Sequence, residues 1–203
     1  MPCSISKALI EKTKDFHGHW CPGLAIGIRA AELAIQELGP PEKTDLVAVV
    51  ETDMCGVDAI QVLTGCTFGK GNLIHRDYGK MAFSFFDRKG GKGFRALFNP
   101  GIQGETGKEL RALMKKAADG TISDQEQKRS EELRKTLPDT YLNAGLKEMF
   151  SVTKLPTPAP RPARVLQSLA CETCGEMTME SRTRRYEGRT LCIPCFAQVD
   201  QKI

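Results

Sequence analysis

The sequence has no long run of apolar residues. Its longest apolar stretches, Leu24 to Ile28 and Leu46 to Val50, are far shorter than the roughly 18 residues that a membrane-spanning helix needs. Residues 1–15 also lack the apolar segment and small-residue cleavage site of a secretory signal. We therefore expect a cytoplasmic protein without a membrane span.

The composition also lacks any strong bias. Hydrophobic residues make up 40% of the 203 positions and charged residues 27%, close to the average of soluble globular domains, which excludes a fibrous or wholly disordered chain. No repeat of about 20 to 50 residues is visible, which argues against a solenoid. The net charge is only +4. A chain of this length predicts two compact units.

Cysteine is the informative residue. The chain holds eight cysteines and no export signal, and in a reducing compartment thiols more often bind metal or carry out chemistry than form disulfides. The even count therefore does not predict four disulfide bridges.

A proline-rich segment divides the chain. Four prolines fall between residues 156 and 162, where they hold the backbone extended as a stiff linker or as an arm on another surface. The predicted organisation is a core domain at 1–153, a linker arm at 154–166 and a small C-terminal domain at 167–203.

Helix and strand signals alternate in the core without a regular βαβ rhythm. Pro22 suits the first turn of a helix, and apolar residues recur every three or four positions up to Gly39. The pattern predicts an α+β fold in which helices pack on an antiparallel or mixed sheet. The predicted helices are 22–38, 55–64, 106–118, 123–136 and 140–148, and the predicted strands are 45–51, 80–87 and 93–98.

The C-terminal domain carries two CxxC pairs. Cys171 and Cys174 are followed, after seventeen residues, by Cys192 and Cys195, a spacing typical of a four-cysteine zinc site. The segment has too few large apolar side chains to fold by burying them alone. A bound ion must therefore supply folding free energy. Four thiolates leave no open position, which predicts a structural zinc. The segment resembles the zinc finger of the DksA/TraR regulators, and a helical tail at 196–201 would make it a treble clef.

Nucleic-acid binding by this finger is disfavoured. Four arginines, at 182, 184, 185 and 189, are clustered as in phosphate-binding surfaces. The four zinc-bound thiolates, however, lower the local charge, and neither interleaved aromatic residues nor coiled-coil heptads accompany the arginines.

A second cluster of metal-ligating residues precedes the predicted helix at 22–38. His17, His19 and Cys21 lie at alternate positions, so they would share one face if the segment is extended. Cys21 falls at a helix N-terminus, where the dipole favours a thiolate. Cys55 begins the next predicted helix and repeats this arrangement. We expect His19, Cys21 and Cys55 to converge on one ion, with His17 and Cys66 completing or orienting the ligand shell.

Two polar residues of the second helix, Asp58 and Gln61, follow Cys55 by one or two turns. They are candidates for contacting the ligands or a bound cofactor, with ordinary helix polar positions as the equal alternative. Cys3 lies outside every motif and His75 lies on a predicted strand, so both are excluded from the site.

Three ordered motifs resemble the FmdE family, which takes its name from one of the subunits of formylmethanofuran dehydrogenase. They are Phe-His-Gly-His-x-Cys-Pro-Gly-Leu-Ala-x-Gly-x-Arg at 16–29, Glu-Thr-Asp-x-Cys-x-x-Asp-Ala-Ile-Gln at 51–61, and Thr-Gly-Cys-Thr-x-Gly-Lys-Gly-Asn-Leu at 64–73, followed by Asp77 to Lys80. The resemblance implies an α+β core, a dimer, and a link to the molybdenum or tungsten enzyme of one-carbon metabolism and methanogenesis.

Three functions follow from these patterns. The first is a metal-binding accessory protein with a core ion, zinc or iron, and a structural zinc in the finger; its partners would be a second copy and molybdenum or tungsten oxidoreductase subunits. The second is an independent metal- or cysteine-dependent enzyme on a small substrate, with Cys21 and His19 as candidate catalytic residues. A nucleic-acid regulator is the least favoured.

Overall fold

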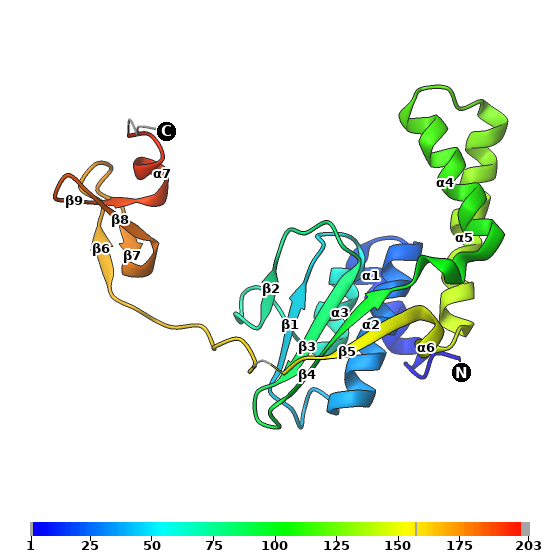
Figure 1. Cartoon of the computed structure of the whole chain (residues 1–203), viewed down its shortest axis with the longest axis horizontal. Coiled ribbons are helices and arrows are strands. Elements are labelled where there is room, and N and C mark those ends of the chain that lie inside the picture. Colours follow the sequence, from blue (N-terminus) through cyan, green and yellow to red (C-terminus); the bar gives the residue numbers. More distant parts are fainter. Residues whose placement is uncertain (1, 157, 200–203) are drawn as a thin grey trace. The chain divides into compact units, whose positions relative to one another are not determined.

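The computed structural model describes residues 2–156 and 158–199, and these form two compact units, 1–162 and 163–203. Figure 1 labels the elements of both units. The first unit contains the helices α1 (Lys7–His17), α2 (Pro22–Leu38), α3 (Gly56–Thr64), α4 (Gly104–Ala118), α5 (Asp124–Asn143) and α6 (Leu146–Met149), a 3-10 turn η1 (Pro100–Gln103), and the strands β1 (Leu46–Val50), β2 (Leu73–His75), β3 (Ala82–Asp87), β4 (Lys92–Phe98) and β5 (Phe150–Lys154).

The five strands form one mixed sheet in the order β2-β1-β3-β4-β5. Strand β2 runs parallel to β1, and the other neighbours are antiparallel. The register is Ala48 opposite Phe85, which is in turn opposite Phe94. Because side chains alternate across a strand, these residues point to one face and their neighbours Val47, Val49 and Phe86 to the other. The predicted α+β class is confirmed.

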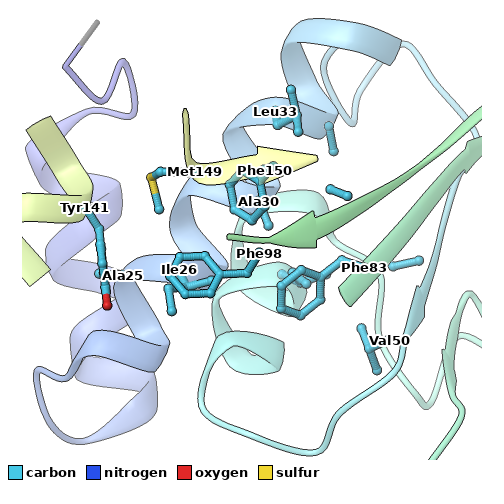
Figure 2. Packing of buried hydrophobic residues seen from close by; sticks show 14 of the residues in the cluster. Ala25, Ile26, Ala30, Leu33, Val50, Phe83, Phe98, Tyr141, Met149 and Phe150 are labelled. Atoms are coloured by element: carbon cyan, nitrogen blue, oxygen red, sulfur yellow. The ribbon is translucent and has the colours of Figure 1, made fainter. Parts of the chain in front are cut away.

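Helix α2 packs on the first face of the sheet and is buried along most of its length. Ala25, Ile26 and Ala30 join the core formed by Phe83 and Phe98, as Figure 2 shows. The predicted bounds of this helix, 22–38, are confirmed, because Pro22 begins it and the Gly39 N–H closes it on the Ile35 carbonyl. Within the described residues, no helix combines the length and the apolar content needed to cross a membrane.

Helices α4 and α5 form an antiparallel hairpin that projects from the sheet (Figure 1). The predicted break between helices at 123–136 and 140–148 is wrong, because α5 continues through Pro138 to Asn143. Proline costs a helix one hydrogen bond. Here the burial of Leu137 and Tyr141 against the core offsets that loss.

The second unit is small and rich in turns. Its elements are the hairpins β6 (Ser168–Ala170) with β7 (Met177–Met179) and β8 (Thr183–Tyr186) with β9 (Arg189–Cys192), a 3-10 turn η2 (Glu180–Arg182), and the helix α7 (Ile193–Phe196). The predicted helix at 196–201 is wrong over residues 197–199, because α7 begins at Ile193 and ends at Phe196, with Ala197 as its C-cap. Residues 200 and 201 lie outside the described residues. Only Cys171, Leu191 and Cys192 form a buried cluster among the described residues here, supported by Tyr186 and Phe196.

Two glycines allow α2 and α3 to approach closely. A Cβ added at Gly27 would overlap the carbonyl oxygen and Cα of Gly56, and a Cβ at Gly56 would lie 3.3 Å from the Cα of Gly27. The backbones of the two helices therefore touch, and any larger residue at Gly27 has to push them apart.

The substitution Gly27→Ala should lower the free energy of unfolding by about 1–3 kcal/mol, because the added methyl group meets rigid backbone. Urea unfolding followed by circular dichroism measures the change. Gly69→Ala is the matched control, since a Cβ there meets nothing within 4 Å, and its effect should stay within about 0.5 kcal/mol. Equal stability of the two variants would show that the helices can separate freely.

Candidate metal centre

Helix α1 delivers the first histidine. It begins at a Ser6 N-cap, whose side chain accepts from the Leu9 N–H, and ends at His17. Gly18 follows with a positive φ of 86° and donates its N–H to the Lys14 carbonyl, a helix end that favours glycine. The condition under which His17, His19 and Cys21 would share one face, an extended segment, does not hold at His17, which is helical. The sharp turn at Gly18 still stacks the rings of His17 and His19, with centroids 4.3 Å apart.

The two cysteines come from the N-termini of α2 and α3. Cys21 is the N-cap of α2, and its sulfur accepts a hydrogen bond from the Leu24 N–H at 3.4 Å. Cys55 is the N-cap of α3 without a side-chain capping bond. Gly23 lies next to both cysteines. A Cβ added at this position would lie 3.2 Å from the Cys55 Cβ and 4.0 Å from the Cys21 Sγ.

The structure brings together His17, His19, Cys21 and Cys55. One ligand atom from each of these four residues lies within 4.8 Å of all the others. Cys21 Sγ, for example, lies 3.8 Å from His17 Nε2. His17, Cys21 and Cys55 are half-buried and His19 is exposed. Two sulfurs and two imidazole nitrogens are the donor set that zinc and iron accept in tetrahedral sites.

Asp58 orients His17. Its carboxylate lies 2.7 Å from His17 Nδ1, and Gln61 donates from Nε2 to the other carboxylate oxygen at 3.4 Å. An Nδ1–H bond to a carboxylate leaves His17 Nε2 with a free lone pair toward the cysteines. Both of these polar residues, which the sequence made candidates, thus lie beside the cluster, Asp58 in direct contact with a ligand and Gln61 behind it.

The electrostatics of the cluster require a cation if both thiols are to ionise. Burial raises the pKa of the Cys55 thiol, and the neighbouring Cys21 raises it further. Two thiolates this close repel one another. A divalent ion removes that repulsion and binds the thiolate form, so the site suits a cation bound with loss of two protons.

Cys66 lies apart from this group. It is fully buried in the hydrophobic core, where its thiol points to the Leu46 carbonyl oxygen at 3.4 Å, and burial raises its pKa. The helix α3 separates it from Cys55, since it follows the Gly65 cap at the opposite end. The four residues that the structure brings together therefore do not include Cys66. Cys3 and His75 are also outside the cluster.

The positions of the glycines beside the site are a second signal in the sequence. This signal is separate from the motifs that predicted the cysteine ligands. Gly23 and Gly27 are four residues apart, so they lie on one side of α2, and Gly56 follows Cys55 directly. Small residues at this spacing mark a helix face that another backbone approaches closely.

The second cluster contains all four predicted finger cysteines, Cys171, Cys174, Cys192 and Cys195. Backbone N–H groups surround the sulfurs: Cys192 donates to Cys171 Sγ at 3.3 Å, and Cys195 donates to Cys192 Sγ at 3.5 Å. N–H donors from Cys174 and Cys192 lower the pKa of Cys171 to about 6, whereas the adjacent Cys192 is the main cause that raises the pKa of Cys195 to about 12. Four thiols in this arrangement fit one structural zinc ion.

The four arginines of the finger are exposed. One of them, Arg185, donates a hydrogen bond from Nη1 to the Thr190 hydroxyl at 2.9 Å. The aromatic residues Tyr186 and Phe196 pack on each other, with centroids 6.2 Å apart. Both rings pack against the small buried cluster of the finger.

Comparison with known proteins gives two family matches. The family model described as "FmdE, Molybdenum formylmethanofuran dehydrogenase operon" matches residues 16–151. The family model described as "Prokaryotic dksA/traR C4-type zinc finger" matches residues 164–201. The first match spans all four residues of the core cluster, and the second spans all four cysteines of the finger.

Individual relatives agree with these matches. A protein of Archaeoglobus fulgidus called a probable S-adenosyl-L-methionine-binding protein is 33% identical over 207 residues, covering 96% of this chain and 54% of that protein. The chain thus spans about half the length of this curated relative. A solved structure, that of a tungsten formylmethanofuran dehydrogenase FmdE-like protein from Syntrophus aciditrophicus, is 25% identical with a TM-score of 0.63, covering 97% of this chain and 96% of that one.

The fold, the ordered motifs around the cluster and the match over residues 16–151 agree with one another. The chain belongs to the FmdE family, and it carries a C4-type zinc finger after the family's core.

Proposed function

We propose that this FmdE-family protein holds one zinc or iron ion at His17, His19, Cys21 and Cys55 and serves as an accessory protein of a molybdenum or tungsten formylmethanofuran dehydrogenase in one-carbon metabolism. The observation that carries the metal proposal is the approach of four ligand atoms to within 4.8 Å of one another. The family match supports the link to the dehydrogenase.

The number of donors favours the accessory role. Four protein ligands fill a tetrahedral ion, as in structural or carrier sites, whereas catalytic zinc keeps a position for water or substrate. Two thiolates and two neutral imidazoles would balance a divalent charge. The bound ion would act as a Lewis acid only if one ligand left it.

The alternative function is an independent enzyme, and the exposure of His19 is the observation that favours it. A ligand at the surface can give way to a substrate more easily than a buried one. X-ray absorption spectroscopy separates the two functions: two sulfur and two nitrogen ligands support the accessory role, and an exchangeable oxygen ligand in place of one histidine supports the enzyme.

The double substitution Cys21→Ser and Cys55→Ser should lower bound metal from two ions per chain to one, because serine is a poor ligand for these ions. Elemental analysis of the purified full-length protein measures the content. Cys174→Ser is the matched variant for the finger. It should also remove one ion, and residues after about 165 should then become sensitive to protease while the core stays protected. If the wild-type protein binds only one ion per chain when metal is in excess, this result contradicts the core metal site.

The substitution Asp58→Asn should weaken core metal binding about tenfold or more, because the His17 ring loses its charged acceptor at 2.7 Å. Competition with a chromogenic chelator measures the affinity. Asp53→Asn, on the exposed loop before α3, is the matched control and should leave the affinity unchanged. If both variants bind metal as the wild type does, Asp58 has no part in orienting the ligand.

The accessory role includes a homodimer. Strand β5 supports it, because it is an outer strand of the sheet and four of its five residues are exposed, and such strands readily pair with another chain. Sedimentation velocity at micromolar concentration should show a dimer of the full-length chain. A monomer would contradict this part of the proposal.

A further inference from the structure

The sheet has a second face, opposite the face that packs on α2. Val47, Val49 and Phe86 line it, and the arm that follows β5 covers part of it through Leu155 and Ala159. The Arg88 side chain fastens the arm by donating from Nε to the Pro160 carbonyl at 2.9 Å. Between the arm and the sheet lies an open cavity of about 410 Å³. Its lining residues are Val49, Glu51, Arg76, Ser84, Phe86, Arg95, Leu155, Pro158 and Pro160.

Strand pairing brings the polar residues of this cavity together from four strands. Val50 pairs with His75, so the next residues, Glu51 and Arg76, leave their strands side by side. Ser84 on β3 pairs with Arg95 on β4. Further along the chain, the Lys80 N–H donates to the Glu51 carbonyl at 2.9 Å. This joins two of the FmdE-like motifs, 51–61 and 77–80.

The cavity holds more hydrogen-bond donors than acceptors. Arg95 donates to the Glu51 carboxylate from Nε at 2.6 Å and from Nη2 at 2.8 Å, which occupies both oxygens of Glu51. Among the described residues, no partner accepts from Arg95 Nη1, the Arg76 guanidinium or the Ser84 hydroxyl. A guanidinium can only donate. These donors are available to an acceptor that enters the cavity from solvent.

The charges have the same imbalance. Two guanidinium groups face one carboxylate, and the bond from Arg95 holds the pKa of Glu51 below its usual range, so Glu51 stays ionised. Lys80 adds a further positive charge nearby. The cavity thus carries an excess of at least one positive charge next to apolar walls, where water screens charge less than it does in bulk.

We propose that this cavity binds a small organic anion whose phosphate or carboxylate group contacts Arg76, Arg95 and Ser84. Guanidinium groups match the oxygens of both anions. The volume exceeds what one such group fills, so the apolar walls formed by Phe86, Leu155 and Pro158 would contact the rest of the molecule. The site lies on the opposite sheet face from α2, so it is independent of the proposed metal centre.

Isothermal titration calorimetry of the full-length protein at low ionic strength tests this proposal with two probes, inorganic phosphate and malonate. Saturable binding of at least one of them at millimolar concentration is expected. Arg76→Ala should weaken it at least tenfold, and Ser84→Ala about fivefold. If the protein binds phosphate more tightly than malonate, the natural ligand carries a phosphate group. If it binds malonate more tightly, the natural ligand carries a carboxylate group.

Two controls locate the bound anion. Arg134→Ala removes an exposed arginine from α5 and should leave the affinity unchanged. The double substitution Cys21→Ser and Cys55→Ser should also leave it unchanged, because the anion is not bound to the core metal. Absence of saturable binding for both probes would overturn the proposal. So would an Arg76→Ala variant that binds like the wild type, or an equal loss in Arg134→Ala.

Discussion

The contact between α2 and α3 at Gly27 and Gly56 determines where the functional side chains lie. Both helices begin at the same end of this contact, and a cysteine occupies the N-cap of each. The backbones touch because neither glycine has a side chain. Had α2 carried an alanine in place of Gly27, its Cβ would overlap the Gly56 backbone, and the two helices would have to separate together with their thiols. His17 depends on this contact as well, since Asp58 on α3 orients it at the end of α1.

The two cysteine clusters differ in what holds them together. In the core, the sheet and the helices α2 and α5 bury a large apolar cluster, so the four ligands are positioned by packing that does not require an ion. In the described part of the finger, only three residues form a buried cluster, and two of them are cysteines. An ion there contributes to folding itself. If the core cluster binds an ion as proposed, the core should stay folded when that ion leaves.

The sheet separates two kinds of chemistry. Its first face supports the helices whose ends carry soft, thiolate-rich donors. Its second face carries guanidinium groups and a hydroxyl beneath the proline-rich arm. The arm lies along the core up to Pro162, because proline-rich backbone is already extended and loses little conformational entropy when it packs. The proposed cation site and the proposed anion-binding cavity thus lie on opposite sides of one sheet.

The features that the sequence by itself determined are those governed by local rules. The spacing of the CxxC pairs identifies the finger, because a two-residue gap places two sulfurs on one ion. Pro22 and Gly39 set both ends of α2. The tertiary structure decided which cysteines meet. Cys55 and Cys66 both fall in FmdE-like motifs, yet only Cys55 lies beside the N-terminus of α2 and Cys21. Packing also carried α5 through Pro138, and strand pairing joined Glu51, Arg76, Ser84 and Arg95. These outcomes depend on contacts between residues far apart in the chain, whose free energies exceed local preference and leave no periodic pattern in the sequence.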